Sequence, residues 1–334
     1  MNDFSEYGGL TKQFEELQAN QPVPPKQALQ ELKASTNDGR EKASEKEMAT
    51  LGPQVVIQDF QIPARDGYSI EARTYRSKSA PTDGSLPLFI HLHGGGFLFG
   101  TLSSEDANCS RVAINAPVVV LNVNYRHSPE HTYPTAWNDT EDAFEWAYTN
   151  AKTLGANSQQ VIIGGISAGS WLTSSLVQAR HRSRTPSTDS IVGHILMIPP
   201  SVHHANSEGL IKHLKSPEVS SYVQNENAPI LSKARIDLFN NLVFPEVPTE
   251  LRANPGNASA EQVKGLPPAV FGIAGADPLR DQGLLYAQLL ASNGVPTNVH
   301  VYKGLPHGFR RFGAQLQEAS TAWDETITGA FVGS

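Results

Sequence analysis

The sequence predicts an α/β fold in which a mostly parallel sheet is covered by helices on both faces. Short apolar runs alternate with helical patterns along most of the chain, which is typical of parallel strands joined by helical crossovers. The runs are almost continuously apolar, as expected of strands that are buried on both faces. The length of 334 residues is enough for one large α/β domain or two average ones.

The strands define the predicted sheet. Residues 54–76 contain two strand patterns around an Asp66-Gly67 turn, which indicates a hairpin and adds an antiparallel edge. Six further strands follow along the chain, so that a sheet of eight strands is expected. These six strands lie within residues 86–97, 116–126, 159–165, 193–200, 268–279 and 296–304.

Helices are predicted after several of these strands. The sequence favours helices at residues 139–155, 167–181 and 281–294. A last helix is indicated by five apolar residues at helical spacing, namely Leu316, Ala319, Trp323, Ile327 and Phe331. With the strands, these helices build a core from residues 51–202 and 263–334.

Two regions do not follow the alternating pattern. Residues 1–50 carry Phe4, Tyr7, Leu10, Phe14 and Leu17 at helical spacing, followed by a proline-rich break and a polar, charged stretch. This pattern predicts one or two helices on a connector. Residues 203–262 are too long for a plain loop, and we interpret them as an insertion with helices of its own. Both regions are therefore predicted to form a helical cap over the core.

The segment from Gly165 to Gly169 has the pattern of a nucleophile elbow. It reads Gly-Ile-Ser-Ala-Gly, and its central Ser167 follows a buried strand and precedes a helix. Glycines at the two ends suit a sharp turn in which side chains would collide with neighbouring backbone. Since Gly and Ser are also ordinary turn residues, the segment needs partners elsewhere in the chain to indicate chemistry.

The second piece is the motif from His93 to Phe97, which reads His-Gly-Gly-Gly-Phe and also follows a strand. A tetrahedral intermediate needs backbone N–H groups that point at the developing oxyanion, and glycines let the chain approach closely enough. The alternative is a flexible or phosphate-binding loop, but neither common phosphate-loop pattern is present.

Two further residues complete a triad. Asp277 and His307 each follow a predicted strand, so that both lie at the same sheet edge as Ser167. A lone Asp before proline is more often a turn residue or a helix cap. Asp277 indicates a catalytic role only in combination with Ser167 and His307. The chain order Ser167, Asp277, His307 is the order expected of an α/β-hydrolase. In this arrangement His307 acts as the base and Asp277 orients it.

Together these motifs resemble the hormone-sensitive-lipase-like (family IV) carboxylesterases of the α/β-hydrolase fold. The matching segments are HGGGF, NYRHSPEHTYPTAWND, GGISAG, ADPLRDQG and PHGF, in family order across residues 93–309. The resemblance implies that the N–H groups of Gly95, Gly96 and Ala168 form the oxyanion hole. It also implies a helical cap, built from the same two regions named above. Ile166 before the serine is similar to fungal members, where bacterial members usually carry aspartate.

The resemblance implies a serine carboxylesterase that forms an acyl-enzyme intermediate. The substrate is expected to be a short-to-medium acyl ester or a hydrophobic small-molecule ester, because the cap candidates are rich in large apolar side chains. The residues expected to line this pocket are Phe97, Phe239, Leu242 and Phe244. Packing of cap on core is the alternative role for such residues. Two other functions stay open: a lyase or dehydratase of specialised metabolism, and a non-catalytic small-molecule receptor.

Composition limits the partners. The formal net charge of −7 argues against nucleic acid or an anionic membrane as a main partner. The single cysteine, Cys109, excludes an intrachain disulfide and a cysteine-based zinc site, and neither a metal nor an organic cofactor is expected. The sequence shows no signal-peptide pattern and no long apolar span, so a cytoplasmic location is expected. A homodimer through an exposed edge strand is a further expectation.

Overall fold

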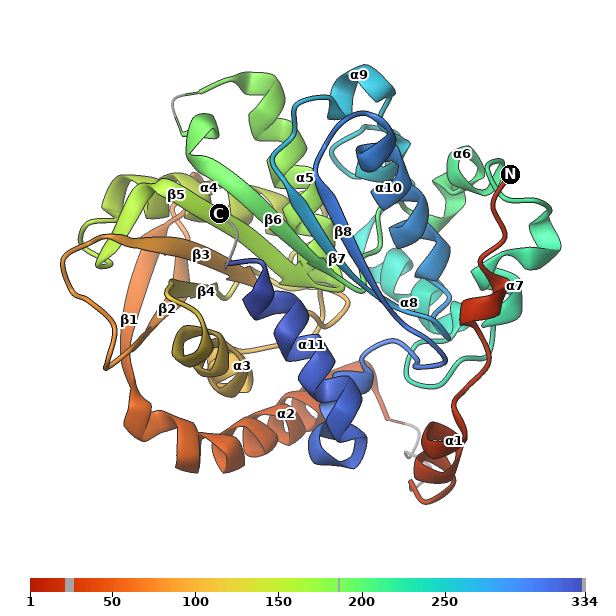
Figure 1. Cartoon of the computed structure of the whole chain (residues 1–334), viewed down its shortest axis with the longest axis horizontal. Coiled ribbons are helices and arrows are strands. Elements are labelled where there is room, and N and C mark those ends of the chain that lie inside the picture. The colour runs from red at the N-terminus through yellow and green to blue at the C-terminus, as the bar shows by residue number, and fades with distance from the viewer. Residues whose placement is uncertain (22–26, 186, 332–334) are drawn as a thin grey trace.

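The computed structural model describes residues 1–21, 27–185 and 187–331. Its centre is one eight-stranded sheet with the strand order β1-β2-β4-β3-β5-β6-β7-β8 (Figure 1). The strands are β1 (Val55–Pro63), β2 (Ser69–Ser77), β3 (Leu86–Leu92), β4 (Val119–Val123), β5 (Ala156–Ile166), β6 (Ile191–Met197), β7 (Ala269–Ala274) and β8 (Thr297–Tyr302). The eight-stranded sheet predicted from the sequence is confirmed.

The pairing of the strands is mostly parallel. The first hairpin pairs β1 with β2 antiparallel, and β2 pairs antiparallel with β4. All the other neighbours, from β4 through β3 to β8, are parallel. Because parallel strands share a direction, the loops after β3, β5, β7 and β8 lie at one edge of the sheet.

The helices and the short 3-10 segments connect and cover this sheet. The helices are α1 (Lys12–Ala19), α2 (Leu29–Leu51), α3 (Leu102–Asn115), α4 (Thr135–Asn150), α5 (Ala168–Ser183), α6 (Glu208–Ile211), α7 (Ser221–Gln224), α8 (Lys233–Val243), α9 (Ala260–Val263), α10 (Arg280–Ser292) and α11 (Gln317–Gly329). The 3-10 segments are η1 (Ser5–Tyr7), η2 (Gly52–Gln54), η3 (Thr188–Ser190), η4 (His204–Asn206), η5 (Pro217–Val219), η6 (Pro255–Asn257) and η7 (Phe309–Leu316).

Two hydrophobic clusters hold the helices to the two faces of the sheet. Helices α4, α5 and α10 share one cluster with one set of strand side chains, including Phe144, Leu172 and Leu290. Helices α3 and α11 share the other, including Val112 and Trp323, and lie in front of the sheet in Figure 1. The strands thus bury apolar side chains on both faces, which explains why their sequences are continuously apolar.

The structure contains a helix that the sequence pattern did not reveal. Helix α3 occupies residues 102–115, between two strands that were predicted without a helix between them. Its start carried a readable signal, since Thr101 accepts a hydrogen bond from the backbone N–H of Ser104. The buried face of α3 includes the polar residues Ser104, Glu105 and Ser110. Polar residues at buried positions interrupt the periodic spacing of apolar residues by which a helix is predicted from sequence.

The described part of the N-terminal region contains two α-helices, in agreement with the one or two helices that its sequence predicts. The helical spacing that begins at Phe4 does not correspond to one helix, because α1 begins at Lys12 after the cap residue Thr11. The polar stretch that follows forms the long helix α2. Hydrogen bonds join helix α2 to α3 and its N-cap: for example, Thr101 Oγ1 donates to Glu41 at 2.6 Å, and the N–H of Ala107 donates to Ser44 at 3.1 Å.

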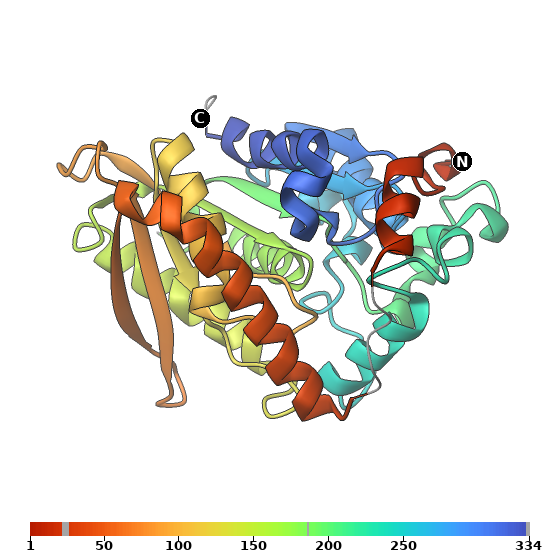
Figure 2. The ribbon, with the colours of Figure 1, turned by 90° about the horizontal axis from the view of Figure 1, so that it is seen from below.

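The elements that were predicted to form a cap lie near the sheet edge that carries the loops after β3, β5, β7 and β8. Figure 2 shows α2 running diagonally across this side of the molecule, with α8 beyond its N-terminal end. Residues 203–262 contain η4, α6, η5, α7, α8, η6 and the start of α9. Within the residues that the structure describes, no helix is both long and apolar enough to cross a membrane.

Candidate active site

Ser167 occupies the sharp turn between β5 and α5. Its backbone has φ 55° and ψ −116°, a region that a non-glycine residue adopts only when the surrounding structure enforces it. A Cβ on Gly165 would lie 2.2 Å from the carbonyl carbon of Gly169. A Cβ on Gly169 would lie 1.9 Å from the carbonyl oxygen of Leu92. Both positions therefore require glycine, and the tight turn presents the serine hydroxyl at the sheet edge.

The structure brings the three predicted residues into one hydrogen-bonded row. His307 Nε2 lies 2.8 Å from Ser167 Oγ, and His307 Nδ1 lies 2.6 Å from Asp277 Oδ2. Asp277 is 1% exposed, and its other oxygen accepts a hydrogen bond of 2.8 Å from the N–H of Leu279. A carboxylate that accepts from Nδ1–H leaves Nε2 as the acceptor for the serine proton.

The glycine motif after β3 packs directly against the elbow. A Cβ on Gly94 would lie 2.8 Å from the carbonyl oxygen of Ile166. Gly95 has φ 142° and Gly96 has φ 61°, which are conformations that favour glycine. A Cβ on Gly95 would lie 2.1 Å from the carbonyl oxygen of Phe99. The loop therefore depends on glycine for its shape as well as for its closeness to the serine.

The predicted oxyanion donors have no competing acceptor. Within the described residues, the backbone N–H groups of Gly95, Gly96 and Ala168 make no hydrogen bond to backbone or side chain. Ala168 is the first residue of α5, where an N–H group has no acceptor inside the helix. Unsatisfied N–H groups beside a nucleophile can bind the negative oxygen of a tetrahedral intermediate.

A buried ion pair supports the glycine motif from behind. Arg40 of α2 donates to the carbonyl oxygen of Gly94 at 3.0 Å and to Glu105 at 2.6 Å. Glu105 is 1% exposed, and its second oxygen lies 3.1 Å from His91 Nε2. Burial opposes ionisation of Glu105, but the hydrogen bond with His91 and the charge of Arg40 outweigh it and lower its pKa. An ionised carboxylate thus holds Arg40 against the loop.

His93, at the start of the same motif, is fully buried. Burial lowers its pKa to about 4, so the ring is neutral near pH 7. The ring stacks on Tyr125 with centroids 4.4 Å apart, and its Nδ1 lies 3.1 Å from the carbonyl oxygen of Gly94. A Cβ on Gly100 would lie 2.3 Å from this ring. His93 is therefore a packed support for the loop.

The four residues predicted to line a pocket fall into two groups. Phe97 and Phe244 are 4% and 5% exposed and belong to one aromatic cluster, in which Phe97 stacks on Trp137 with centroids 4.8 Å apart. The structure thus places these two in the core. Phe239 and Leu242 are half-buried on α8. Phe239 touches the glycine motif, since a Cβ on Gly96 would lie 2.5 Å from its Cδ2 atom.

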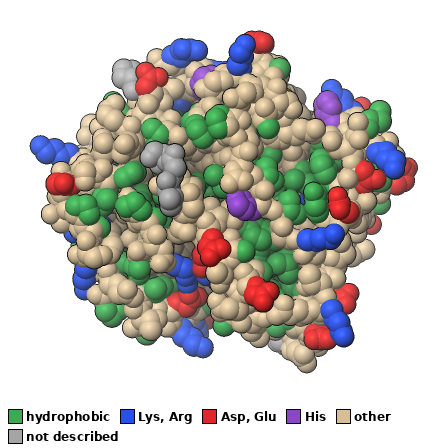
Figure 3. All heavy atoms as spheres, in the orientation of Figure 1, with side chains coloured by type: hydrophobic (Ala, Val, Ile, Leu, Met, Phe, Trp, Pro, Cys, Tyr) green, Lys and Arg blue, Asp and Glu red, His purple; other side chains and the backbone are tan. Residues whose placement is uncertain are grey.

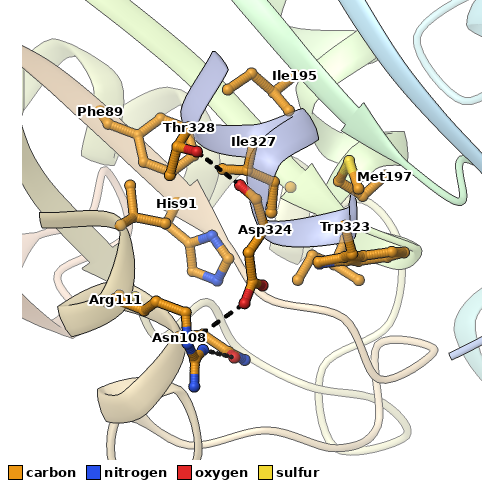
Figure 4. Close-up of a pocket in the computed structure, with 14 residues that line it drawn as sticks. Phe89, His91, Asn108, Arg111, Ile195, Met197, Trp323, Asp324, Ile327 and Thr328 are labelled. Carbon is orange, nitrogen blue, oxygen red and sulfur yellow. Dashed lines mark hydrogen bonds and ion pairs between the residues drawn. The ribbon is translucent and has the colours of Figure 1, made fainter. Parts of the chain in front are cut away.

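A separate cavity lies on the α3 and α11 side of the sheet. Figure 4 shows its lining, where the His91 ring and Asp324 face the space and Asp324 pairs with Arg111 at 3.5 Å. The cavity has a volume of about 30 Å³, and its lining does not include Ser167, Asp277 or His307. A space of this size holds about two water molecules. It is too small for an organic substrate.

The chain is similar to known proteins along most of its length. A family model described as the alpha/beta hydrolase fold matches residues 89–311, which include all three residues of the hydrogen-bonded row. The chain belongs to the alpha/beta hydrolase family. The predicted fold and the predicted similarity to hormone-sensitive-lipase-like carboxylesterases are confirmed. The fungal origin indicated by Ile166 stays a prediction.

Relatives of this hydrolase are named as esterases. It is 31% identical to Esterase LipI of Mycobacterium tuberculosis over 271 residues, which covers 81% of this chain and 80% of that protein. The solved structure of an esterase from Pyrobaculum calidifontis is 28% identical, with a TM-score of 0.79, and the match covers 96% and 98% of the two chains. The hydrolase is accordingly a carboxylic ester hydrolase.

One solved structure carries a different name. Vibralactone cyclase is 28% identical to this hydrolase with a TM-score of 0.84, and the match covers 97% of this chain and 95% of that one. The same fold therefore supports more than one reaction name, and the reaction has to be argued from the site itself.

Sequence reasoning missed several charged residues near the site. Arg40 lies in a polar, charged stretch that indicated a helix but no site, and Arg235 and Arg311 lie in segments without a strong motif. Their positions relative to the site depend on contacts between elements far apart in the sequence. Only the tertiary structure brings them together.

Proposed function

We propose that this carboxylic ester hydrolase uses Ser167 as a nucleophile and hydrolyses short-to-medium acyl esters or a hydrophobic small-molecule ester. The observation that carries the proposal is the row of two hydrogen bonds, 2.8 Å and 2.6 Å long, from Ser167 through His307 to Asp277. Nucleophile, base and orienting carboxylate in hydrogen-bond reach are the arrangement that activates a serine.

The proposed reaction has two steps. In the first, Ser167 Oγ attacks the ester carbonyl while His307 Nε2 takes its proton, and His307 then returns that proton to the leaving alcohol. In the second, His307 activates a water molecule that attacks the acyl-enzyme and releases the acid. Asp277 holds the imidazole in place and stabilises its positive charge. The reaction balances without an external oxidant, reductant or cofactor.

The backbone donors are assigned to the oxyanion. We propose that the N–H groups of Gly95, Gly96 and Ala168 bind the oxygen that becomes negative in each tetrahedral intermediate. Such donors act on charge that develops only in the transition state, and losing one typically lowers the rate by about 10²–10³. The lack of another acceptor for these three groups among the described residues supports this role.

The substrate class is inferred from the apolar side chains of α8 that lie beside the glycine motif. Phe239 and Leu242 place half-buried apolar side chains on α8, and Phe239 lies against Gly96. We propose that residues 1–50 and 203–262 form a cap, and that α2 and α8 of this cap border the substrate. An apolar wall next to the reacting carbonyl favours a small acyl group over a polymer.

A second candidate reaction has one observation in its favour. The similarity to vibralactone cyclase shows that a protein of this fold carries a name other than hydrolase. If water were excluded from the acyl-enzyme, an internal hydroxyl of the substrate would become the second nucleophile. Analysis of the products separates the two, since hydrolysis releases a free acid and an alcohol.

The experiment that tests the proposal is hydrolysis of 4-nitrophenyl acetate, butyrate, octanoate and palmitate by the wild type and by Ser167→Ala. Ser183→Ala serves as a control, because Ser183 is an exposed residue at the end of the same helix. We expect turnover of the shorter esters by the wild type and by Ser183→Ala, and its loss in Ser167→Ala. Equal turnover by Ser167→Ala would show that the assigned nucleophile is wrong.

We propose a cytoplasmic protein whose partner is a small-molecule ester, with neither nucleic acid nor membrane as a main partner. The net charge of −7 supports this, and Figure 3 shows acidic and basic side chains interspersed on the face it displays.

We also propose a homodimer through an edge strand, since β8 is an edge of the sheet and its Val299 is 39% exposed. Light scattering of the purified protein tests the dimer.

A further inference from the structure

Three arginine side chains from three separate elements approach the glycine motif and the His307 loop. Arg40 of α2 lies against the glycine motif, since a Cβ on Gly95 would be 3.0 Å from its Nη1. Arg311 of η7 lies beside the residue that follows His307, since a Cβ on Gly308 would be 3.5 Å from its Nη2. The third, from α8, is described next.

Arg235 reaches the same area from α8. Its Cζ lies 5.5 Å from the centre of the Phe239 ring, and that ring lies against Gly96. Its Nη1 donates to the carbonyl oxygen of Ile230 at 3.2 Å. The side chain of Ile230 in turn lies 3.7 Å from the position of a Cβ on Gly308. Arg235 and Arg311 are thus linked through Ile230 and Gly308, on the side of the site that carries His307.

Two of these three charges lack an acidic partner. Arg40 pairs with Glu105 at 2.6 Å, which balances its charge. Arg235 and Arg311 form no ion pair with any carboxylate among the described residues, and the side chain of Arg311 makes no hydrogen bond there either. In a chain with 33 acidic and 26 basic residues, two neighbouring arginines without a carboxylate are a local excess of positive charge.

The environment makes these unbalanced charges costly. Burial lowers the pKa of Arg235, and burial together with the charges of Arg40 and Arg235 lowers the pKa of Arg311 to about 10. Arg311 is nevertheless exposed to solvent. The guanidinium of Arg311 is thus partly desolvated by the protein around it and has no carboxylate beside it among the described residues. A charge in such a place is stabilised when an opposite charge binds beside it.

We infer that the ester substrate carries a carboxylate, and that Arg311, assisted by Arg235, binds this carboxylate while Ser167 attacks the ester. This inference rests on the proposed function. A carboxylate matches the planar guanidinium, which donates two parallel hydrogen bonds. The apolar wall formed by Phe239 then faces the chain that joins the carboxylate to the ester. The substrate is thus a half-ester of a dicarboxylic acid or a hydroxy acid whose hydroxyl group is acylated and whose carboxylate is free.

The test compares anionic esters with neutral esters of the same shape. For a charge on the acyl side, 4-nitrophenyl hemiadipate is compared with 4-nitrophenyl 6-methylheptanoate. For a charge on the alcohol side, 4-acetoxybenzoate is compared with 4-isopropylphenyl acetate. In each pair an isopropyl group replaces the carboxylate. The readout is the ratio of kcat/KM for the anionic ester to kcat/KM for the neutral ester, measured in the wild type and in each variant.

The variants isolate Arg311. Because each ratio is compared between enzymes, differences in the intrinsic reactivity of the esters cancel. We expect Arg311→Met to lower the ratio by about 10- to 100-fold in at least one pair, as expected for loss of charge-assisted hydrogen bonds. Arg311→Lys should retain part of the preference, and Arg235→Met should lower it less. Arg310→Met is the matched control, since Arg310 lies next in sequence, carries the same charge, and pairs with Asp324 at 2.8 Å instead.

The outcomes separate this inference from the proposed function. If the wild type hydrolyses the neutral esters, and Arg311→Met leaves both ratios within about twofold of wild type, the carboxylate site is wrong while the esterase mechanism stands. An equal fall of the ratio in Arg310→Met would also refute it, because the effect would then reflect total charge rather than a binding site. If the wild type hydrolyses neither member of either pair, the proposed function and the inference fail together.

Discussion

His194 gives a sharp test of how a buried histidine sets the response of this protein to acid. It lies in the middle of β6, with Ile163 of β5 and Ala269 of β7 as its neighbours in the sheet. The residue is 1% exposed, and neither ring nitrogen has a hydrogen-bond partner among the described residues. Burial lowers its pKa from 6.5 to about 4, an effect that nearby carbonyl groups of Pro268 and Pro267 partly offset.

The sign and the size of the effect follow from these two pKa values. Between pH 6.5 and about 4, the unfolded chain protonates His194 while the folded protein keeps it neutral. The unfolded state therefore binds more protons, and the free energy of unfolding falls as the pH falls through this range. Each pH unit contributes about 1.4 kcal/mol, so that a range of about 2.5 units corresponds to about 3 kcal/mol.

The assay is urea unfolding of the wild type and of His194→Leu at several values between about pH 7 and pH 4.5, above most carboxylate titration. The variant removes the titrating ring, and we expect its free energy of unfolding to change with pH by about 2–3 kcal/mol less than that of the wild type over this range. His300→Gln is the control, because His300 is exposed on β8. The same pH dependence in His194→Leu and in the wild type would refute the reasoning, whatever the stability at pH 7.

Four other predictions concern the site, its support and the stability of helix α2. Asp277→Asn should lower kcat for 4-nitrophenyl butyrate by about 10⁴, because an amide favours the wrong imidazole tautomer, and a loss below tenfold would contradict the assigned role. Gly169→Ala should abolish activity, since its Cβ would lie 1.9 Å from the carbonyl oxygen of Leu92. A Cβ on Gly39 in α2 would meet nothing within 4 Å. Gly39→Ala should therefore raise the free energy of unfolding by about 0.5–1 kcal/mol in urea titrations. Arg40→Met should lower kcat about tenfold through the glycine motif while KM for the neutral ester stays constant, and an unchanged kcat would show that this motif needs no support from α2.

The sequence by itself determined the class of fold and the three residues that the structure joins in one hydrogen-bonded row. Strands buried on both faces must be continuously apolar, so the sheet is visible in the pattern. Ser167, Asp277 and His307 each follow such a strand, and parallel strands place the residues that follow them at one edge. Motifs of this kind are local, because a tight turn needs glycine at fixed offsets from the serine.

The contacts that hold α2 against α3 could not be assigned from the sequence pattern. The amphipathic period predicts helices whose apolar face meets the core, but α2 lies on α3 through contacts such as Glu41 with Thr101 and Ser44 with Ala107. The same reason hid α3, whose buried face includes Glu105. Buried polar residues do not contribute to the apolar periodicity from which a buried helix face is predicted, and their hydrogen-bond partners lie far away in the sequence.

The tertiary structure alone decided which charges surround the site. Arg40, Arg235 and Arg311 stand in different elements, and nothing in the residues next to each one states that they approach the same loops. The structure also moved Phe97 and Phe244 from the predicted pocket wall into an aromatic core. Local sequence sets the backbone turn that presents Ser167, whereas the environment of Ser167 depends on packing between distant segments, which only the folded chain fixes.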